Sequence, residues 1–149
     1  MTHRHGRLVA LAVALPVLAL AACGNDQGSY CSALEADQER FAEMLEDTSG
    51  LGLLKQRGTL GSIAEKAPDD LRDEWQTFLG AIDAFSDTLD EVGVEPDDFD
   101  GGRPPAGLSE ADRTRIANAA DELSSGDVVE AANGIEQHAK DVCKLQLGL

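Results

Sequence analysis

The chain has 149 residues, of which 28 are Asp or Glu and 12 are Lys or Arg, so its formal net charge is −16 at pH 7. We expect no nucleic-acid partner, because binding to phosphates depends on clustered Lys and Arg. The length suffices for one domain around one hydrophobic core.

The N-terminus has the features of an export signal. Arg4 and Arg7 precede a run of thirteen apolar residues, 8–20, and two alanines then precede Cys23. A basic start, a short apolar run and small residues before a cleavage site are typical of a secretory signal peptide. The run is too short for a membrane-spanning helix, which needs about 20 residues. Leu20-Ala21-Ala22-Cys23 also resembles the lipobox of bacterial membrane lipoproteins.

This resemblance implies that Cys23 receives a diacylglyceryl group and becomes the N-terminus after cleavage. We therefore expect a lipoprotein signal peptide over 1–22, a lipidated Cys23 with a flexible tether over 23–29, and a single acidic helical domain over 30–149. Such acyl chains, palmitate among them, would hold the protein on the extracytoplasmic face of the cell membrane. The alternative is an ordinary signal peptide that leaves Cys23 as a free thiol.

The other two cysteines, Cys31 and Cys143, are an even pair in an exported chain, which predicts a disulfide. A metal site or two free thiols are the alternatives. A shared zinc ion is disfavoured, because His138 and Cys143 are five residues apart and point about 140° away from each other on a helix. We expect no metal.

The spacing of apolar residues predicts an all-α fold, an antiparallel bundle of four to five helices linked by the disulfide. The clearest helix covers 69–92, whose apolar positions alternate at spacings of 4 and 3 (Leu71, Trp75, Phe78, Ile82, Phe85, Leu89 and Val92). Further helices are expected over 29–47, 51–67, 109–123 and 127–142. The disulfide would then make the first and last helices run antiparallel.

Local signals fix several helix ends. Pro68 favours a start and Gly93 a stop, and Ser109 with Asp112 resembles a capping box. Gly52, Gly58 and Gly61 weaken the helix expected over 51–67, each by about 1 kcal/mol if it lies in the interior.

The helical register argues against a haem site. Met44 and His138 are the candidate ligands, but the disulfide register separates their levels by eight residues, about 12 Å along the axis. We expect His138 to lie level with Ala36 and Asp37, near a carboxylate, and we expect no cofactor.

Acidic residues form two columns at a spacing of four. One could expect a solvated surface, a docking face for a basic protein partner, or a divalent-cation site. The residues 98–103 do not form an EF-hand, because Gly102 and Arg103 occupy positions that need a ligand and a glycine. Phe99, within this acidic loop, is expected to be tucked onto the bundle. The candidate contact face comprises Glu35, Glu39, Glu43, Asp47, Asp83, Asp87 and Glu91.

Catalytic motifs are missing: the sequence has no HExxH, P-loop, GxGxxG or CxxC pattern, so we expect no enzyme. The stretches SYCSALEAD, KAPDDLRDEW and HAKDVCKL loosely resemble small helical lipoproteins of actinobacteria, a resemblance that implies no activity. Our leading hypothesis is a lipid-anchored extracytoplasmic module that interacts with another protein at the cell envelope. The alternatives are a ligand-binding or divalent-cation-binding lipoprotein and a purely structural envelope protein.

Overall fold

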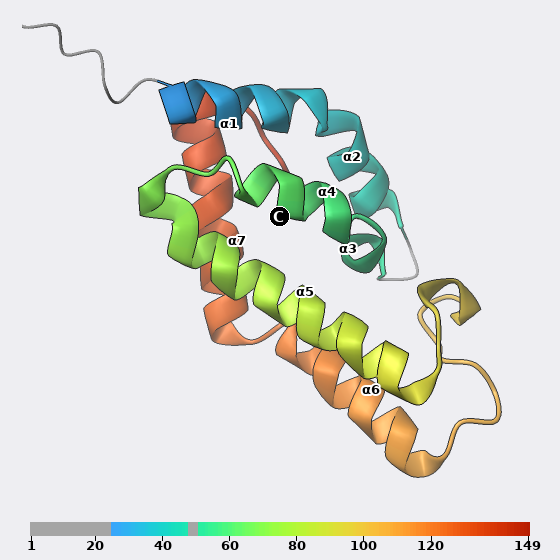
Figure 1. Cartoon of the computed structure of the whole chain (residues 1–149). Coiled ribbons are helices and arrows are strands. Elements are labelled where there is room, and N and C mark those ends of the chain that lie inside the picture. Colours follow the sequence, from blue (N-terminus) through green and yellow to red (C-terminus); the bar gives the residue numbers. More distant parts are fainter. Residues whose placement is uncertain (1–24, 48–50) are drawn as a thin grey trace, which may run out of the picture.

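A computed structural model describes residues 25–47 and 51–149. This part of the chain is all-α: it contains seven α-helices and no β-strand, as the apolar spacing predicts (Figure 1). Three short turns of 3₁₀ or π helix supplement them: η1 (Asp69–Leu71), η2 (Pro96–Asp98) and η3 (Ala139–Cys143). The α-helices are α1 (Asn25–Ala36), α2 (Gln38–Glu46), α3 (Gly52–Lys55), α4 (Arg57–Ala64), α5 (Arg72–Val92), α6 (Glu110–Glu122) and α7 (Gly126–His138).

The longest helix, α5, lies at the centre of the bundle and contacts α4, α6 and α7. The predicted apolar positions within α5 are buried, Val92 partly and the other five almost completely, and the remaining position, Leu71, is buried in the preceding turn η1. Figure 1 shows α6 returning beside α5 in the opposite direction. Gly93 ends α5 with a left-handed φ of 70°, and the Ser109 Oγ caps α6 by accepting the Asp112 N–H at 3.1 Å, so both predicted ends are confirmed.

Two of the predicted helices are each divided in two, which turns five helical segments into seven helices. Asp37 leaves helical geometry between α1 and α2, and Gln56 does so between α3 and α4. Leu34 on α1 and Phe41 on α2 are seven residues apart, a spacing that places them on one helical face, and both are buried in the core on either side of the bend at Asp37.

The helix α1 also begins earlier than expected. It starts at Asn25, inside the segment 23–29 that we expected to be a flexible tether. The buried Tyr30 fixes this helix against the core, and a helix that is held by packing propagates into neighbouring polar residues. Residues 1–24, including the signal peptide and Cys23, lie outside the described residues.

The predicted disulfide is present, joining Cys31 of α1 to Cys143 of η3 with a Cα–Cα distance of 5.1 Å. The antiparallel pairing that we derived from it is wrong. Figure 1 shows α1 crossing the end of α7 at a steep angle. A disulfide fixes one point on each element and leaves the crossing angle to the packing of the surrounding side chains.

The residues after the disulfide fold back into the body, which the sequence did not indicate. Lys144 adopts a left-handed φ of 61° and reverses the chain, and Leu147 is only 2% exposed (Figure 1). The Glu136 carboxylate holds this segment by accepting the N–H groups of Leu147 at 3.0 Å and Gly148 at 2.9 Å. Burial raises the pKa of Glu136, but these bonds and the Lys140 ammonium outweigh burial, so that its pKa is lowered overall.

Candidate functional site

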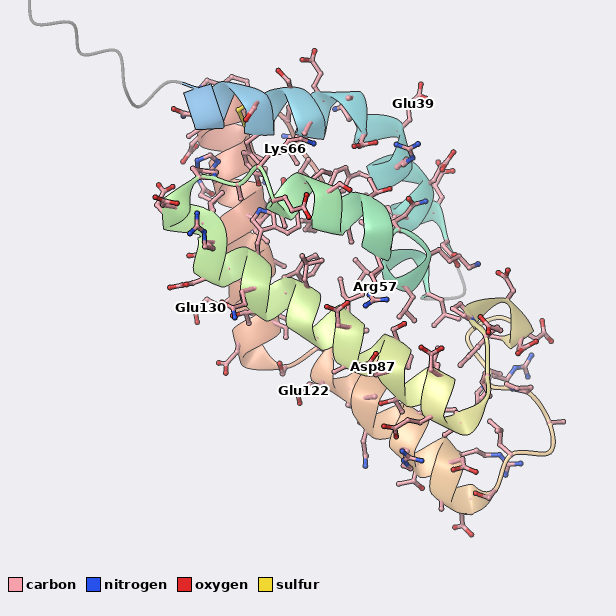
Figure 2. All side chains as sticks on the ribbon, viewed as in Figure 1. Glu39, Arg57, Lys66, Asp87, Glu122 and Glu130 are labelled. Carbon is pink, nitrogen blue, oxygen red and sulfur yellow. A yellow bond between two sulfur atoms is a disulfide. The ribbon has the colours of Figure 1, made fainter. Side chains whose placement is uncertain are left out.

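The first acidic column lies on the outer side of α1 and α2. Glu35, Glu39 and Glu43 are exposed and make no ion pair with any described residue. Because the chain bends at Asp37, the column turns with it, and Figure 2 shows Glu39 pointing away from the body at this corner. The fourth member, Asp47, instead pairs with Lys55 at 3.1 Å and raises the pKa of that ammonium group.

Most of the second acidic column forms ion pairs with neighbouring helices. Asp83 pairs with Arg57 of α4, and Glu91 pairs with Arg115 of α6, so both carboxylates join α5 to a neighbouring helix. Asp83 raises the pKa of Arg57, and Asp87 adds to that effect from one turn away. In Figure 2 Arg57 extends from α4 toward the helix that carries Asp87. The seven acidic residues therefore do not form one continuous face.

The neighbours of His138 differ from those that the sequence predicted. His138 packs against the ring of Tyr30, with ring centroids 5.6 Å apart, and not beside Ala36 and Asp37. The cause is again the steep crossing of α1 over the end of α7. Met44 is buried in the core. Among the described residues there is no group of three or more His, Cys, Asp or Glu arranged to hold a metal ion.

The clearest cavity is an apolar pocket that the sequence did not predict, here called the first pocket. It has a volume of about 380 Å³, within the range of small-molecule sites. Segments of α2, α3, α5 and α7, the residue that follows α6 and the C-terminal segment meet there, and none of the described side chains that line it is charged. Its lining is Met44, Leu45, Gly52, Leu53, Phe78, Leu123, Val128, Val129, Ala132, Asn133, Gly148 and Leu149.

Two exposed apolar side chains mark this pocket. Leu45 is 56% exposed and Val129 is 48% exposed, and they are the large hydrophobic residues that the described part of the chain leaves open to solvent. Both line the first pocket, one from α2 and the other from α7. Single exposed apolar residues are ordinary, whereas two at the same cavity define an apolar patch.

A second pocket adjoins the first, since Leu53 and Leu123 line both. Its volume is about 480 Å³, and one face of α6 forms much of its wall. Phe99, partly buried as predicted, covers it from the loop after α5. We call the two pockets together the apolar groove. The lining of the second pocket is Leu51, Leu53, Phe85, Phe99, Gly102, Pro104, Arg113, Ile116, Ala117, Ala120, Leu123 and Ser124.

Of the described residues that line the apolar groove, Arg113 is the one with a charged side chain. Ten Lys and Arg residues fall within the described ranges; seven pair with carboxylates and two donate to backbone carbonyls, whereas the Arg113 side chain does neither. Its acidic neighbour Asp112 is bonded to Ser109 and lies 3.8 Å from Arg115. Within residues 25–47 and 51–149, Arg113 is therefore an exposed guanidinium without a carboxylate partner, in a strongly acidic protein.

One sequence signal could have indicated the groove. Met44-Leu45 and Val128-Val129 are adjacent apolar pairs, and neighbouring helical residues point about 100° apart. One member of each pair can enter the core while the other remains at its edge. Met44 and Val128 are the buried members, and Leu45 and Val129 are the exposed ones.

In comparisons with known proteins, no family model matches the chain, and no curated protein or solved structure matches it significantly. Over residues 25–47 and 51–149, no helix combines the length and the apolar character needed to cross a membrane.

Proposed function

We propose that this protein is a lipid-anchored extracytoplasmic binding module that holds an apolar ligand in the groove between α2, α3, α6 and α7. The observation that carries this proposal is the position of Leu45 and Val129 at a cavity without charged side chains, in a chain of which 27% is charged. An apolar concave site of this size is the usual form of a small-molecule site.

The test of binding is a titration with a neutral fluorescent probe, N-phenyl-1-naphthylamine, whose emission rises in apolar surroundings. We expect saturable binding to the wild-type protein. Ala132→Phe places a ring in the first pocket and should abolish most of that binding. Ala84→Phe adds the same ring to an exposed position of α5 outside the apolar groove and should leave binding unchanged. Binding that is equal in all three proteins would reject the groove as the site.

The lipid anchor is a separate part of the proposal and rests on the lipobox resemblance of residues 20–23. Intact cells that express the protein would be labelled with an alkyne analogue of palmitate. We expect label on the wild-type chain and none on Cys23→Ala, whose disulfide between Cys31 and Cys143 is retained. Label on both chains, or on neither, would contradict lipidation at Cys23.

A second candidate function is docking of a basic protein partner, and the unpaired carboxylates of Glu35, Glu39 and Glu43 favour it. Such an interaction would weaken as salt screens the charges. Cross-linking in intact cells, followed by recovery of the complex, would compare the wild type with a triple Glu→Lys variant of these residues. A partner that is retained by the triple variant would exclude this face.

A further inference from the structure

We propose that the ligand of the apolar groove is a single-chain amphiphile with an anionic head group, whose alkyl chain lies along the groove and whose head group binds Arg113. This inference rests on the proposed function and adds the chemical class of the ligand. Two ligand sources share this chemistry, a fatty-acid carboxylate and a lipid phosphate.

Arg113 is placed where it could bind the head group of a ligand in the groove. It lies on the face of α6 that also presents Ile116, Ala117 and Ala120 to the second pocket. A guanidinium group pairs with a carboxylate or phosphate through two parallel hydrogen bonds. Arg113 is exposed, so its guanidinium is open to a head group at the mouth of the second pocket. Among the described residues, no carboxylate forms an ion pair with the Arg113 guanidinium.

The negative charge of the remaining surface disfavours anion binding elsewhere on the protein. The chain has a net charge of −16, so an anion is repelled by most of the surface and needs a local positive charge to bind. Other pockets of the described structure have carboxylates in their walls, such as Asp83 in one and Asp127 and Glu130 in another. The two pockets of the apolar groove have no Asp or Glu among their described lining residues, which distinguishes the groove from these other pockets.

The dimensions fit one alkyl chain. Arg113 lines the second pocket, and Leu123, ten residues further on and directly after the end of α6, lies in the wall that the two pockets share. Ten residues of helix cover about 15 Å, a length that the extended chain of a long-chain fatty acid can span. The head group would then lie at Arg113 and the end of the chain beside Leu53, Leu123 and the first pocket.

The experiment compares ligands of equal chain length by displacement of N-phenyl-1-naphthylamine, below their aggregation concentrations. The ligands are laurate, dodecyl phosphate, dodecanol and dodecyltrimethylammonium. We expect an anion to bind the wild type about tenfold more tightly than dodecanol, the difference that one charge-assisted interaction supplies. Tighter binding of laurate would identify a carboxylate as the preferred head group, and tighter binding of dodecyl phosphate would identify a phosphate.

Variants of Arg113 complete the test. Arg113→Gln should reduce the affinity for the anion to that for dodecanol and leave dodecanol binding unchanged, and Arg113→Lys should restore part of the preference. Arg72→Gln, at an exposed arginine outside the groove, is the matched control. Equal binding of dodecanol and both anions, or a preference for the cation, would overturn the inference and leave the apolar site intact. Failure of every ligand and of the probe would reject the proposed function itself.

Discussion

The indole Nε1 of Trp75 donates a hydrogen bond of 3.0 Å to the hydroxyl of Tyr30, and both side chains are buried. The two residues are 45 positions apart, so this bond joins α1 to α5 inside the core. Trp75 was predicted from the apolar seam of α5, but the sequence did not assign a partner to its indole N–H. The bond satisfies a donor that would otherwise be buried without an acceptor.

Tyr30→Phe should therefore destabilise the fold by about 1–3 kcal/mol, because it leaves the Trp75 N–H buried without an acceptor. The free energy of unfolding in urea measures the effect. A double-mutant cycle with Trp75→Phe supplies the control: the two losses should be less than additive if the hydrogen bond is the cause. Additive losses would show that each ring contributes only through packing.

The hydroxyl of Tyr30 should also ionise at a higher pH than an exposed tyrosine. Burial raises the pKa of Tyr30 to about 12, and the Trp75 bond only partly offsets burial. Since the folded pKa lies above the unfolded value of 10.0, this group contributes stability below pH 10.0, and the contribution is lost as the pH rises toward about 12. Tyr30 is the chain's one tyrosine, so ultraviolet absorbance reports its ionisation directly. Ionisation of the folded protein near pH 10.0 would contradict the burial of this hydroxyl.

Reduction of the disulfide should lower stability substantially. Cys31 and Cys143 are 112 residues apart in sequence, and a loop of this length corresponds to about 4–5 kcal/mol in the chain-entropy model. We expect a reductant to lower the melting temperature of the wild type and to have no effect on a Cys31→Ser/Cys143→Ser variant. A wild-type melting temperature that is insensitive to full reduction would show that the link contributes little.

Two glycines provide a matched pair for the packing of α2 against α3. A Cβ atom at Gly52 would lie 2.4 Å from the backbone oxygen of Met44, whereas a Cβ atom at Gly80 would meet nothing within 4 Å. Gly52→Ala should therefore destabilise by about 1–3 kcal/mol, since backbone must move. Gly80→Ala should stabilise by about 0.5–1 kcal/mol, because alanine favours the helix interior. Similar unfolding free energies for both variants would refute the close approach.

The features predicted from sequence are those that depend on one segment alone. The seam of α5, the Gly93 stop, the Ser109 cap and the pairing of the two cysteines each follow from local spacing or from counting. The division at Asp37 and the crossing of α1 over α7 depend on how several helices share one core, which no single segment encodes.

The apolar groove has the same origin. Segments of α2, α3, α5, α6 and α7 and the C-terminal segment meet at it, and their spacings predict only that each has an apolar face. The sequence did not identify Arg113 as a site residue. Its distinguishing property is the lack of an ion-pair partner, and ion pairs between elements are defined only after folding. The acidic columns were visible in the sequence, but their division into unpaired and paired carboxylates depends on Arg57, Lys55 and Arg115 of other elements.

Glu136 should make the docking of the C-terminal segment dependent on pH. Its pKa is lowered from the ordinary value of 4.5, so the ionised carboxylate contributes stability above that value, and the contribution is lost as the pH falls through the lowered pKa. At neutral pH, Glu136→Gln should cost about 1.5–3 kcal/mol, because a charged acceptor of two backbone N–H groups is replaced by a neutral one.

Hydrogen exchange of the Leu147 and Gly148 amides reports this contact directly. We expect protection in the wild type at neutral pH, faster opening in acid, and fast opening of Glu136→Gln at both. Glu43→Gln, at an exposed carboxylate without an ion pair, should behave as the wild type. Because the difference between the wild type and Glu136→Gln arises from the ionised carboxylate, it must shrink below pH 4.5, and a difference that is constant across this range would mean that the side chain acts through its shape alone.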